Sequence, residues 1–357
     1  MPRIPDTFFI EMSTAAQAAL ANLDNAAKAR EFNRSVADIT GSFTKKIIKG
    51  KTYWYYQTRD PDGKPQQVYL GPESPLMQGL ISQRHEQNSI ASAAHLSRLA
   101  AAAVALGASK IAPKHGRVIR RMAEYGFFRA GGVLAGTHAF LSYQNMLGVR
   151  WTHGDMTMDV DFAHPGKSVV MAFDNLVKVD VRTALESLQM GFIPVHGQAR
   201  FKKKDEPDFD VDFLTNLKRA GSAPMKVASL GISLQPLKFM ELAFEHPAQT
   251  VILLNDGPLV VSVPRPEIFA FHKLIVSQER KDNDHLKALK DAAQACALIT
   301  YFLDNNLPAL LDAHAHVTGR GSGWRKRVEA GLRQLDVEAP GHHVAERLQA
   351  AHLQAVE

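Results

Sequence analysis

Two stretches in which apolar and acidic residues alternate constrain the fold of this chain more than any other feature of its sequence. They are Thr157–Phe162, which reads TMDVDF, and Asp208–Leu214, which reads DFDVDFL. Side chains of a β-strand point alternately to its two faces, so each stretch places its acids on one face and its apolar residues on the other. The pattern therefore predicts two strands that each bury one face in a core.

The acids on these strands predict a metal site. Asp159 and Asp161 share a face about 6.6 Å apart along the strand, and like charges there repel unless a cation lies between them. Mg²⁺ or Mn²⁺ with oxygen ligands would satisfy them. If the second stretch pairs beside the first, Asp212 or Asp210 completes a set of three carboxylates, and Asp208 shares their phase. Three carboxylates suit a centre of two ions about 3.5–4 Å apart.

A glycine-rich stretch precedes the first acidic strand. It contains Gly131 and Gly132, then Gly136 and Thr137 near the start of a helix predicted from about Leu134 to Met146. The amides of a helix N-terminus bind phosphate. A small residue at Gly136 lets a phosphate approach the backbone, and Thr137 adds a hydroxyl donor.

The order of these elements resembles the nucleotidyltransferase fold of the DNA polymerase β superfamily, and most closely a poorly characterised bacterial branch of it. The superfamily carries Gly-Gly or Gly-Ser at a helix start, a D-x-D strand and a third strand carboxylate. These match Gly136 with Thr137, Asp159 with Asp161, and Asp212. Threonine replaces the usual serine but keeps the hydroxyl.

The resemblance extends to a second cluster nearer the C-terminus. Related proteins have a helix with a lysine followed by a basic and acidic stretch, which matches Lys273 and the segment from Arg280 to Asp284. Lys273 and Lys281 would then meet a triphosphate as point charges. We expect the next helix to bury Leu286, Leu289, Ala293 and Cys296.

The segment at residues 41–70 is rich in aromatic and β-branched residues and predicts a β-hairpin that turns at Asp60–Gly63. Its basic residues are Lys45, Lys46, Lys49, Lys51 and Arg59, and they surround the run Tyr53-Trp54-Tyr55-Tyr56. Such a hairpin could bind nucleic acid by stacking and charge. Equally, its aromatic side could simply pack on the next helix.

Composition excludes several classes of protein. Apolar residues make up 45% and charged residues 22%, unlike a disordered chain. A single cysteine, Cys296, excludes an intramolecular disulfide and a zinc site built from cysteines. The 15 histidines show no metal-binding spacing. His138 beside Thr137 could orient a substrate, but a lone histidine near a helix start is more often structural. No run reaches the about 20 apolar residues of a membrane span. We therefore expect a cytoplasmic protein with no membrane partner.

The pattern as a whole predicts an α+β protein in three parts: an N-terminal helical arm with the hairpin (1–110), a mixed-sheet nucleotidyltransferase core (111–264) and a C-terminal helical region (265–357). Expected helices cover 6–38, 77–107, 113–125, 134–146, 175–189 and much of the chain from Pro266. Expected strands cover 127–132, 157–163, 191–195, 199–204, 208–214, 250–254 and 259–263, with a loop at 216–229.

The resemblance implies a metal-dependent enzyme that moves a nucleoside monophosphate from an NTP to an acceptor. Asp159, Asp161 and Asp212 would be its catalytic metal ligands, with Mg²⁺ or Mn²⁺ as cofactor. Gly136, Thr137, Lys273 and Lys281 would bind the NTP. The acceptor, which could be RNA or a protein, and the oligomeric state stay open. Two alternatives also stay open: a toxin that modifies RNA or protein, and a binding module on an inactive fold.

Overall fold

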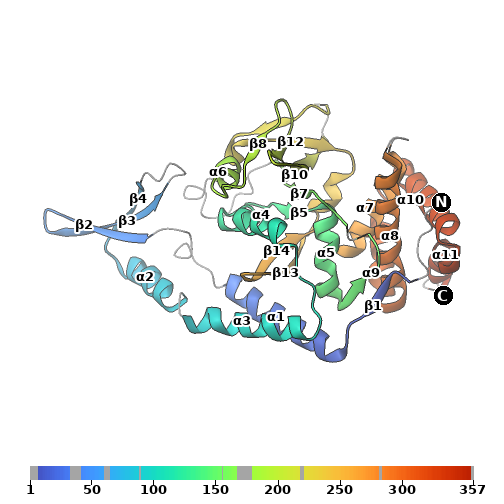
Figure 1. The fold of residues 1–357 in the computed structure, drawn as a ribbon, viewed down its shortest axis with the longest axis horizontal. Helices are drawn as coiled ribbons and strands as arrows, with labels where there is room; N and C mark the ends of the chain where they lie inside the picture. Colours follow the sequence, from blue (N-terminus) through green and yellow to red (C-terminus); the bar gives the residue numbers. More distant parts are fainter. Residues whose placement is uncertain are drawn as a thin grey trace.

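The computed structural model of the protein describes residues 7–32, 42–59, 65–87, 90–154, 156–166, 179–217, 221–280 and 284–354. Over these residues helices combine with a sheet that has parallel and antiparallel pairs, which confirms the α+β class. Figure 1 shows a central body of sheet and helices, a helical layer on the side of the C-terminus, and a small sheet that projects from the opposite side.

The N-terminal part holds a short strand, three helices and the small projecting sheet. β1 (Phe9–Glu11) pairs antiparallel with β6 (Val149–Trp151). The sheet consists of β2 (Ser42–Ile48), β3 (Lys51–Arg59) and β4 (Pro65–Pro72), and α2 (Pro75–Gln87) follows it. α1 (Thr14–Phe32) and α3 (Ile90–Ala105) share a small apolar core with the hairpin strand β13 (Ala248–Leu254).

The central sheet has the order β11-β12-β10-β7-β5, and β8 and β9 extend it along the first half of β10. β10 (Glu206–Asn216) is the longest of the described strands and lies parallel to both β7 (Val160–Ala163) and β12 (Ile232–Leu237). The remaining strands are β5 (Val133–Leu134), β8 (Phe192–Pro194), β9 (Arg200–Lys203) and β11 (Met225–Val227). The helices of this part are α4 (Pro113–Glu124), α5 (Gly136–Leu147) and α6 (Val181–Glu186), with short 3₁₀ turns at Ala228–Leu230 and Met240–Phe244.

β13 and β14 (Gly257–Val263) form an antiparallel hairpin, and helices follow it. They are α7 (Pro266–Glu279), α8 (His285–Asn305), α9 (Leu307–Thr318), α10 (Ser322–Glu338) and α11 (Val344–Gln354), with a 3₁₀ turn at Pro340–His342. Most of the buried side chains of the central body and of these helices belong to one continuous core. The helices therefore pack directly on the body that carries the acids. No helix among the described residues is long and apolar enough to cross a membrane.

Most of the predicted elements are confirmed. Pro113 is the first residue of α4, which buries Val118, Ile119 and Met122 as its spacing predicts. β7, β8 and β9 lie within their predicted ranges. β10, β13 and β14 contain theirs and extend beyond them by two to four residues, and the helix predicted at 134–146 is α5. The helix predicted at 175–189 is described from residue 179 and is helical only at Val181–Glu186.

Other predictions were wrong where pairing with distant segments decides the structure. The helix predicted from residue 6 begins at Thr14 because β1 pairs with β6, and the range 77–107 contains two helices, α2 and α3. Residues 127–132 form turns, and the strand β5 begins only after them. The predicted loop at 216–229 contains β11, and β12 was not predicted at all; these two strands pair with each other.

The small sheet has three strands where a two-stranded hairpin was predicted. The additional turn lies at Lys49 and Gly50, which have φ values of 49° and 75°. A two-residue turn with both central residues at positive φ matches the twist of the strands that it joins. Lysine is uncommon in that conformation, so residue types alone did not indicate this turn. The turn predicted at Asp60–Gly63 lies outside the described residues.

Candidate active site

The two acidic strands lie side by side, as their alternation predicts. β7 and β10 are parallel neighbours in which Asp161 is directly opposite Asp212. Asp210, two residues before Asp212 on β10, falls on the same face because side chains alternate along a strand. Asp159 directly precedes β7, and it lies near enough to Asp210 and Asp212 for their carboxylates to raise its pKa. Asp208 is exposed and lies beyond this pairing, where the register of β10 is irregular. One face of the sheet thus presents the carboxylates Asp159, Asp161, Asp210 and Asp212.

The opposite face of the same strands holds the acids in place. Val160, Phe162, Val211 and Phe213 are completely buried there. The rings of Phe162 and Phe213 stack at a centroid distance of 5.6 Å, which continues the parallel pairing into the core. A shift of either strand by one residue would bury its acids and expose these rings, so the apolar face determines the register.

Gly136 brings the start of α5 against Asp161. The backbone amide of Ala135 donates to the carbonyl of Asp161 (2.9 Å), and the next residue is Gly136 with φ +56°. A Cβ atom on Gly136 would lie 1.8 Å from Oδ2 of Asp161. Only glycine fits this position, because any side chain would collide with the carboxylate and would need an unfavourable backbone conformation. The positive end of the helix dipole therefore lies beside the acids.

An arginine that the sequence reasoning missed lies among these carboxylates. Arg200 on β9 is opposite Asp212 in the antiparallel pairing with β10. Its Nε and Nη2 donate to the two oxygens of Asp212 at 2.6 and 2.7 Å, and its Nη1 lies 3.0 Å from Asp210. Lys202, two residues on, lies 3.8 Å from Asp210. The β10 acids are thus neutralised by the chain itself.

Asp159, directly before β7, and Asp161, on β7, lack such a partner. The ion pairs found among the described residues include Asp210 and Asp212 but neither Asp159 nor Asp161. Burial, the nearby carboxylate of Asp212 and that of Asp159 raise the pKa of Asp161 to about 6, although Lys273 and Lys290 oppose the rise. Burial and the carboxylates of Asp210 and Asp212 also raise the pKa of Asp159. Negative charge is therefore in excess on the β7 side of the cluster.

A buried ion pair joins the C-terminal helices beside this site. Lys273 on α7 is buried and donates to Oδ1 of Asp291 on α8 at 2.5 Å. Arg280 contacts the other oxygen of Asp291 at 2.8 and 3.0 Å. Burial alone would raise the pKa of Asp291, but the two cations lower it. Lys273 is thus held rigidly, and its charge acts on Asp161.

One face of α8 is turned toward the acids. Lys287, Lys290, Asp291 and Gln294 are spaced three and four residues apart, which places them on one side of a helix. Lys287 acts to lower the pKa of Asp159, and Lys290 acts to lower that of Asp161. Both carboxylates in turn act on Lys290. Burial and the charge of Lys273 lower the pKa of Lys290 itself.

The sequence had instead predicted an apolar face on α8. Of the four residues expected to be buried, only Cys296 is; Leu289 and Ala293 are partly buried, and Leu286 is 77% exposed. The buried side of the helix includes the polar residues Asp291 and Gln294 because they contact the site. Burial raises the pKa of the Cys296 thiol to about 12, so it is no nucleophile at neutral pH.

The other predicted site residues have mixed surroundings. Thr137 is buried, with its hydroxyl 3.5 Å from the amide of Gln294, so in this structure it does not line an open surface. His138 is buried and makes a 3.1 Å contact with His115, which agrees with the structural role expected for it. Lys281 lies outside the described residues.

The acids fit a divalent cation in part. Asp159 and Asp161 offer oxygen ligands, and their raised pKa values show that a nearby positive charge would stabilise them. Asp210 and Asp212 are held by Arg200 and could become ligands only after it moves. Accordingly, no three histidine, cysteine or acidic side chains among the described residues are grouped closely enough to hold an ion as they stand.

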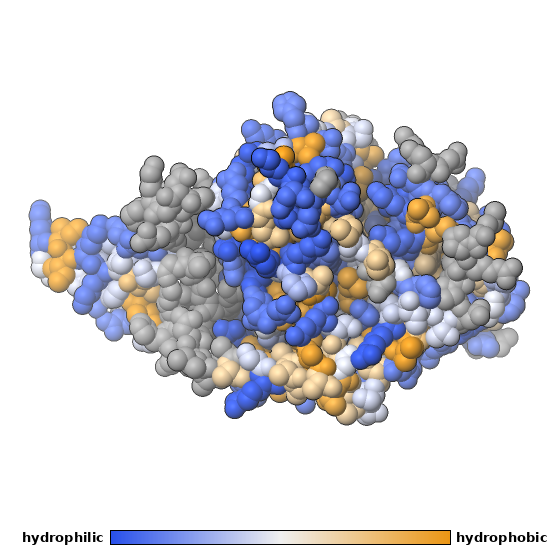
Figure 2. All heavy atoms as spheres, viewed as in Figure 1, coloured by the Kyte–Doolittle hydropathy of each residue, from blue (hydrophilic) through white to orange (hydrophobic). Residues whose placement is uncertain are grey.

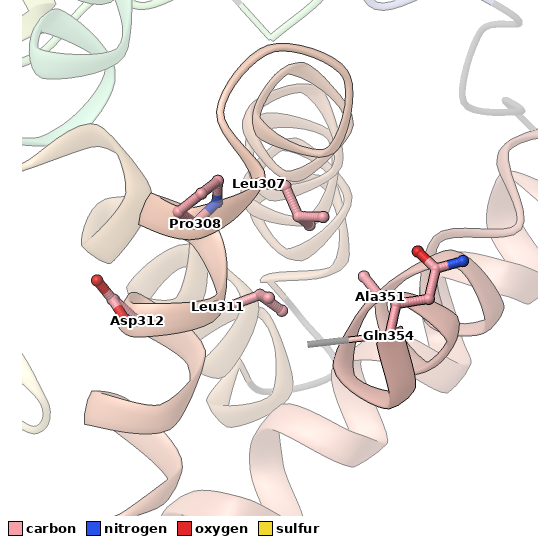
Figure 3. Close-up of a pocket in the computed structure, with 6 residues that line it drawn as sticks. All are labelled: Leu307, Pro308, Leu311, Asp312, Ala351 and Gln354. Atoms are coloured by element: carbon pink, nitrogen blue, oxygen red, sulfur yellow. The ribbon is translucent and has the colours of Figure 1, made fainter. Parts of the chain in front are cut away.

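A separate hollow lies between α9 and α11. It is lined by Leu307, Pro308, Leu311, Asp312, Ala351 and Gln354 (Figure 3). Its single charged lining residue, Asp312, belongs to neither acidic strand, and no other titratable side chain lines it. The hollow therefore lacks the groups needed for acid–base or metal chemistry, and the acids of β7 and β10 are the better candidate site.

Some of the missed residues left a signal in the sequence. Arg200 and Lys202 alternate on a strand that was predicted, so a basic face opposite the acidic one could have been inferred. The spacing of Lys287, Lys290 and Gln294 is equally visible, but apolar residues at another phase of the same helix hid it. What the sequence could not show is that β9 pairs with β10 on the side away from β7.

Residues 113–318, more than half of the chain, match the model of a protein family described as Nucleotidyltransferase. The matched range begins at the first residue of α4 and ends at the last residue of α9. It contains the acidic strands, Gly136, Arg200 and the pair of Lys273 with Asp291. No curated protein and no solved structure matches the chain significantly.

Proposed function

Because the chain belongs to the nucleotidyltransferase family, we propose that it transfers a nucleoside monophosphate from an NTP to a hydroxyl group of an acceptor, with the help of divalent metal ions. We further propose that it falls within the DNA polymerase β superfamily, in a bacterial branch, and that it acts in the cytoplasm. The observation that carries the proposal is the register of β7 on β10, which sets Asp161 opposite Asp212 beside Gly136.

Asp159 and Asp161 are the proposed primary metal ligands. They lie close together, and neither takes part in an ion pair among the described residues. Mg²⁺ or Mn²⁺ held there would neutralise the triphosphate and lower the pKa of the attacking hydroxyl. Asp212 is the proposed third ligand, and it becomes available when the Arg200 guanidinium turns toward an incoming phosphate.

The cations of the C-terminal helices are proposed to hold the triphosphate. Lys273 is fixed by Asp291, and Lys290 is partly buried between the acids and α7, with its pKa lowered by burial and by the charge of Lys273. A phosphate group placed there would relieve the repulsion between the two lysines. In the proposed reaction, the acceptor hydroxyl gives its proton to Asp212 and its oxygen bonds to the α-phosphorus. The bond between the α-phosphorus and the oxygen that bridges to the β-phosphate breaks, and pyrophosphate leaves with its charge balanced by these lysines.

The proposal is tested by incubating the protein with each α-labelled NTP, Mg²⁺ or Mn²⁺, and either total cell RNA or a protein lysate. Transfer of label that requires metal and is lost in Asp161→Asn supports the proposal. Asp208→Asn is the matched control, because it makes the same chemical change on an exposed acid of the neighbouring strand β10. If NTP binds tightly but no acceptor is labelled under any of these conditions, the chain is a binding module.

A further inference from the structure

The small sheet β2–β3–β4 stands apart from the body of the protein. Figure 1 shows it projecting on the side opposite the C-terminal helices, and Figure 2 shows hydrophobic and hydrophilic residues next to each other at its tip. Ile47 and Ile48, at the end of β2, are 70% and 47% exposed. The candidate active site takes no residue from this sheet, so its surface needs an explanation of its own.

One face of the sheet carries three tyrosines across two strands. Tyr53 and Tyr55 alternate with Trp54 on β3 and share a face, and Tyr69 on β4 is directly opposite Tyr55. The ring centroid of Tyr69 lies 5.4 Å from that of Tyr55 and 6.2 Å from that of Tyr53. Tyr69 is 53% exposed. We call the surface formed by Tyr53, Tyr55 and Tyr69 the tyrosine face.

Positive charge lies on the tyrosine face. Lys46 on β2 is opposite Tyr53, its ammonium nitrogen lies 4.6 Å from the ring centroid of Tyr55, and it donates to Gln67 on β4 at 2.7 Å. Lys51 shares the face by alternation along β3 and is exposed. The strands β2, β3 and β4 together contain four basic residues and no acidic residue, so the sheet attracts an anion.

The other face of the sheet is built differently. Tyr56 is buried and packs edge-to-face on Phe43 at a centroid distance of 5.3 Å. Trp54, on the same side as Tyr56, is only partly exposed. This side has the residues of a packing surface. Of the two interpretations that the sequence left open, packing therefore fits this face, and nucleic-acid binding is left to the tyrosine face.

We propose that the tyrosine face binds single-stranded RNA and so presents it as the acceptor of the transfer reaction. Naming RNA as the acceptor rests on the proposed function, whereas the binding itself does not. Flat aromatic side chains on the surface of a sheet stack unpaired bases, and neighbouring lysines neutralise phosphates. A duplex keeps its bases stacked inside and offers no ring surface, and RNA is the nucleic acid whose loops and ends commonly expose unpaired bases.

The binding is tested with full-length protein and a fluorescent, unstructured RNA of about 15 nucleotides, a length near the upper end of single-strand sites. Anisotropy titrations at about 50 and about 200 mM KCl give the affinity and its salt dependence. We expect Tyr55→Leu and Tyr69→Leu each to weaken binding about tenfold, and Tyr55→Phe to retain it because phenylalanine still stacks. An RNA duplex of the same sequence should bind more weakly, because its bases stay stacked inside.

The lysines provide a matched pair of variants. Lys46 and Lys45 are chain neighbours on opposite faces, both exposed. Lys46→Gln should reduce the slope of log affinity against log salt by about 0.7, the value for one phosphate contact on a single strand, while Lys45→Gln leaves it unchanged. Equal effects of the two substitutions would overturn the proposal. Equal binding of the RNA duplex would also overturn it, as would RNA binding that changes neither with the tyrosine substitutions nor with salt concentration.

The failure of this inference can be told apart from the failure of the proposed function. Asp161 belongs to the acid cluster and not to the tyrosine face. The Asp161→Asn variant should therefore bind RNA with the affinity of the unchanged protein. If the protein binds RNA but transfers no label, the RNA-binding surface is supported and the transferase proposal is rejected. Label transfer to another acceptor, together with absent RNA binding, has the opposite meaning and rejects RNA as the acceptor.

Discussion

Replacing Asp161 by asparagine should make the metal-free protein more stable while it removes activity. Asp161 lies beside Gly136 and opposite Asp212, in a site with excess negative charge. Burial and the neighbouring carboxylates raise its pKa from 3.8 to about 6. A residue whose ionisation is opposed by the fold destabilises the fold whenever it is ionised.

The size of the effect follows from this pKa. Since one pKa unit corresponds to about 1.4 kcal/mol, a rise from 3.8 to about 6 lowers the free energy of unfolding by at most about 3 kcal/mol when the carboxylate is ionised. The folded protein holds the proton more tightly than the unfolded chain. The contribution of Asp161 to the free energy of unfolding is therefore most favourable at low pH, and it falls as the pH rises from about 4 to about 6. Asparagine should recover about 1–3 kcal/mol above this range and almost nothing below it.

Urea unfolding in the presence of EDTA, on either side of this pH range, measures the difference. Asp208→Asn, on an exposed acid, should show no such gain at either pH. Adding Mg²⁺ at the higher pH should stabilise the unchanged protein, by about 2.7 kcal/mol at a metal concentration 100 times the dissociation constant, and should stabilise Asp161→Asn much less. The reasoning is refuted if Asp161→Asn is equally stable or less stable than the unchanged protein in EDTA at high pH, or if Mg²⁺ stabilises both equally.

Three further predictions concern neighbouring residues. Gly136→Ala should abolish label transfer and lower the melting temperature, because its Cβ would lie 1.8 Å from Asp161 Oδ2; a fully active alanine variant would contradict the packing. Arg200→Gln should lower the Mg²⁺ concentration needed for half-maximal stabilisation, since it frees Asp210 and Asp212, whereas the control Lys202→Gln, 3.8 Å from Asp210, should change it little. Burial lowers the pKa of His138 to about 3 and that of His115 to about 4, so stability should fall as the pH drops below 6.5, by up to about 1.4 kcal/mol per pH unit for each histidine. In His138→Gln that fall should be shallower, and an unchanged pH dependence would show that the pair does not remain neutral.

Alternation by itself was enough to predict the acidic strands. Asp159, Asp161, Asp210 and Asp212 fall on one face because Val160, Phe162, Val211 and Phe213 must all be buried on the other. That requirement acts within each strand and needs no knowledge of the neighbours. In the same way, Pro113 and its following apolar spacing predicted α4, and the Gly136–Thr137 pair predicted the start of α5.

Contacts between distant segments were beyond the reach of local patterns. Arg200 meets Asp212 only because β9 turns back along β10, and Lys273 meets Asp291 only because α7 and α8 pack side by side. The short strands β5 and β12 exist because longer strands beside them supply hydrogen-bond partners. A local pattern shows which face of a helix or strand is buried, because the buried side chains recur with the period of that element. Which element covers that face, and therefore which charge lies next to which, is decided by packing across the whole chain.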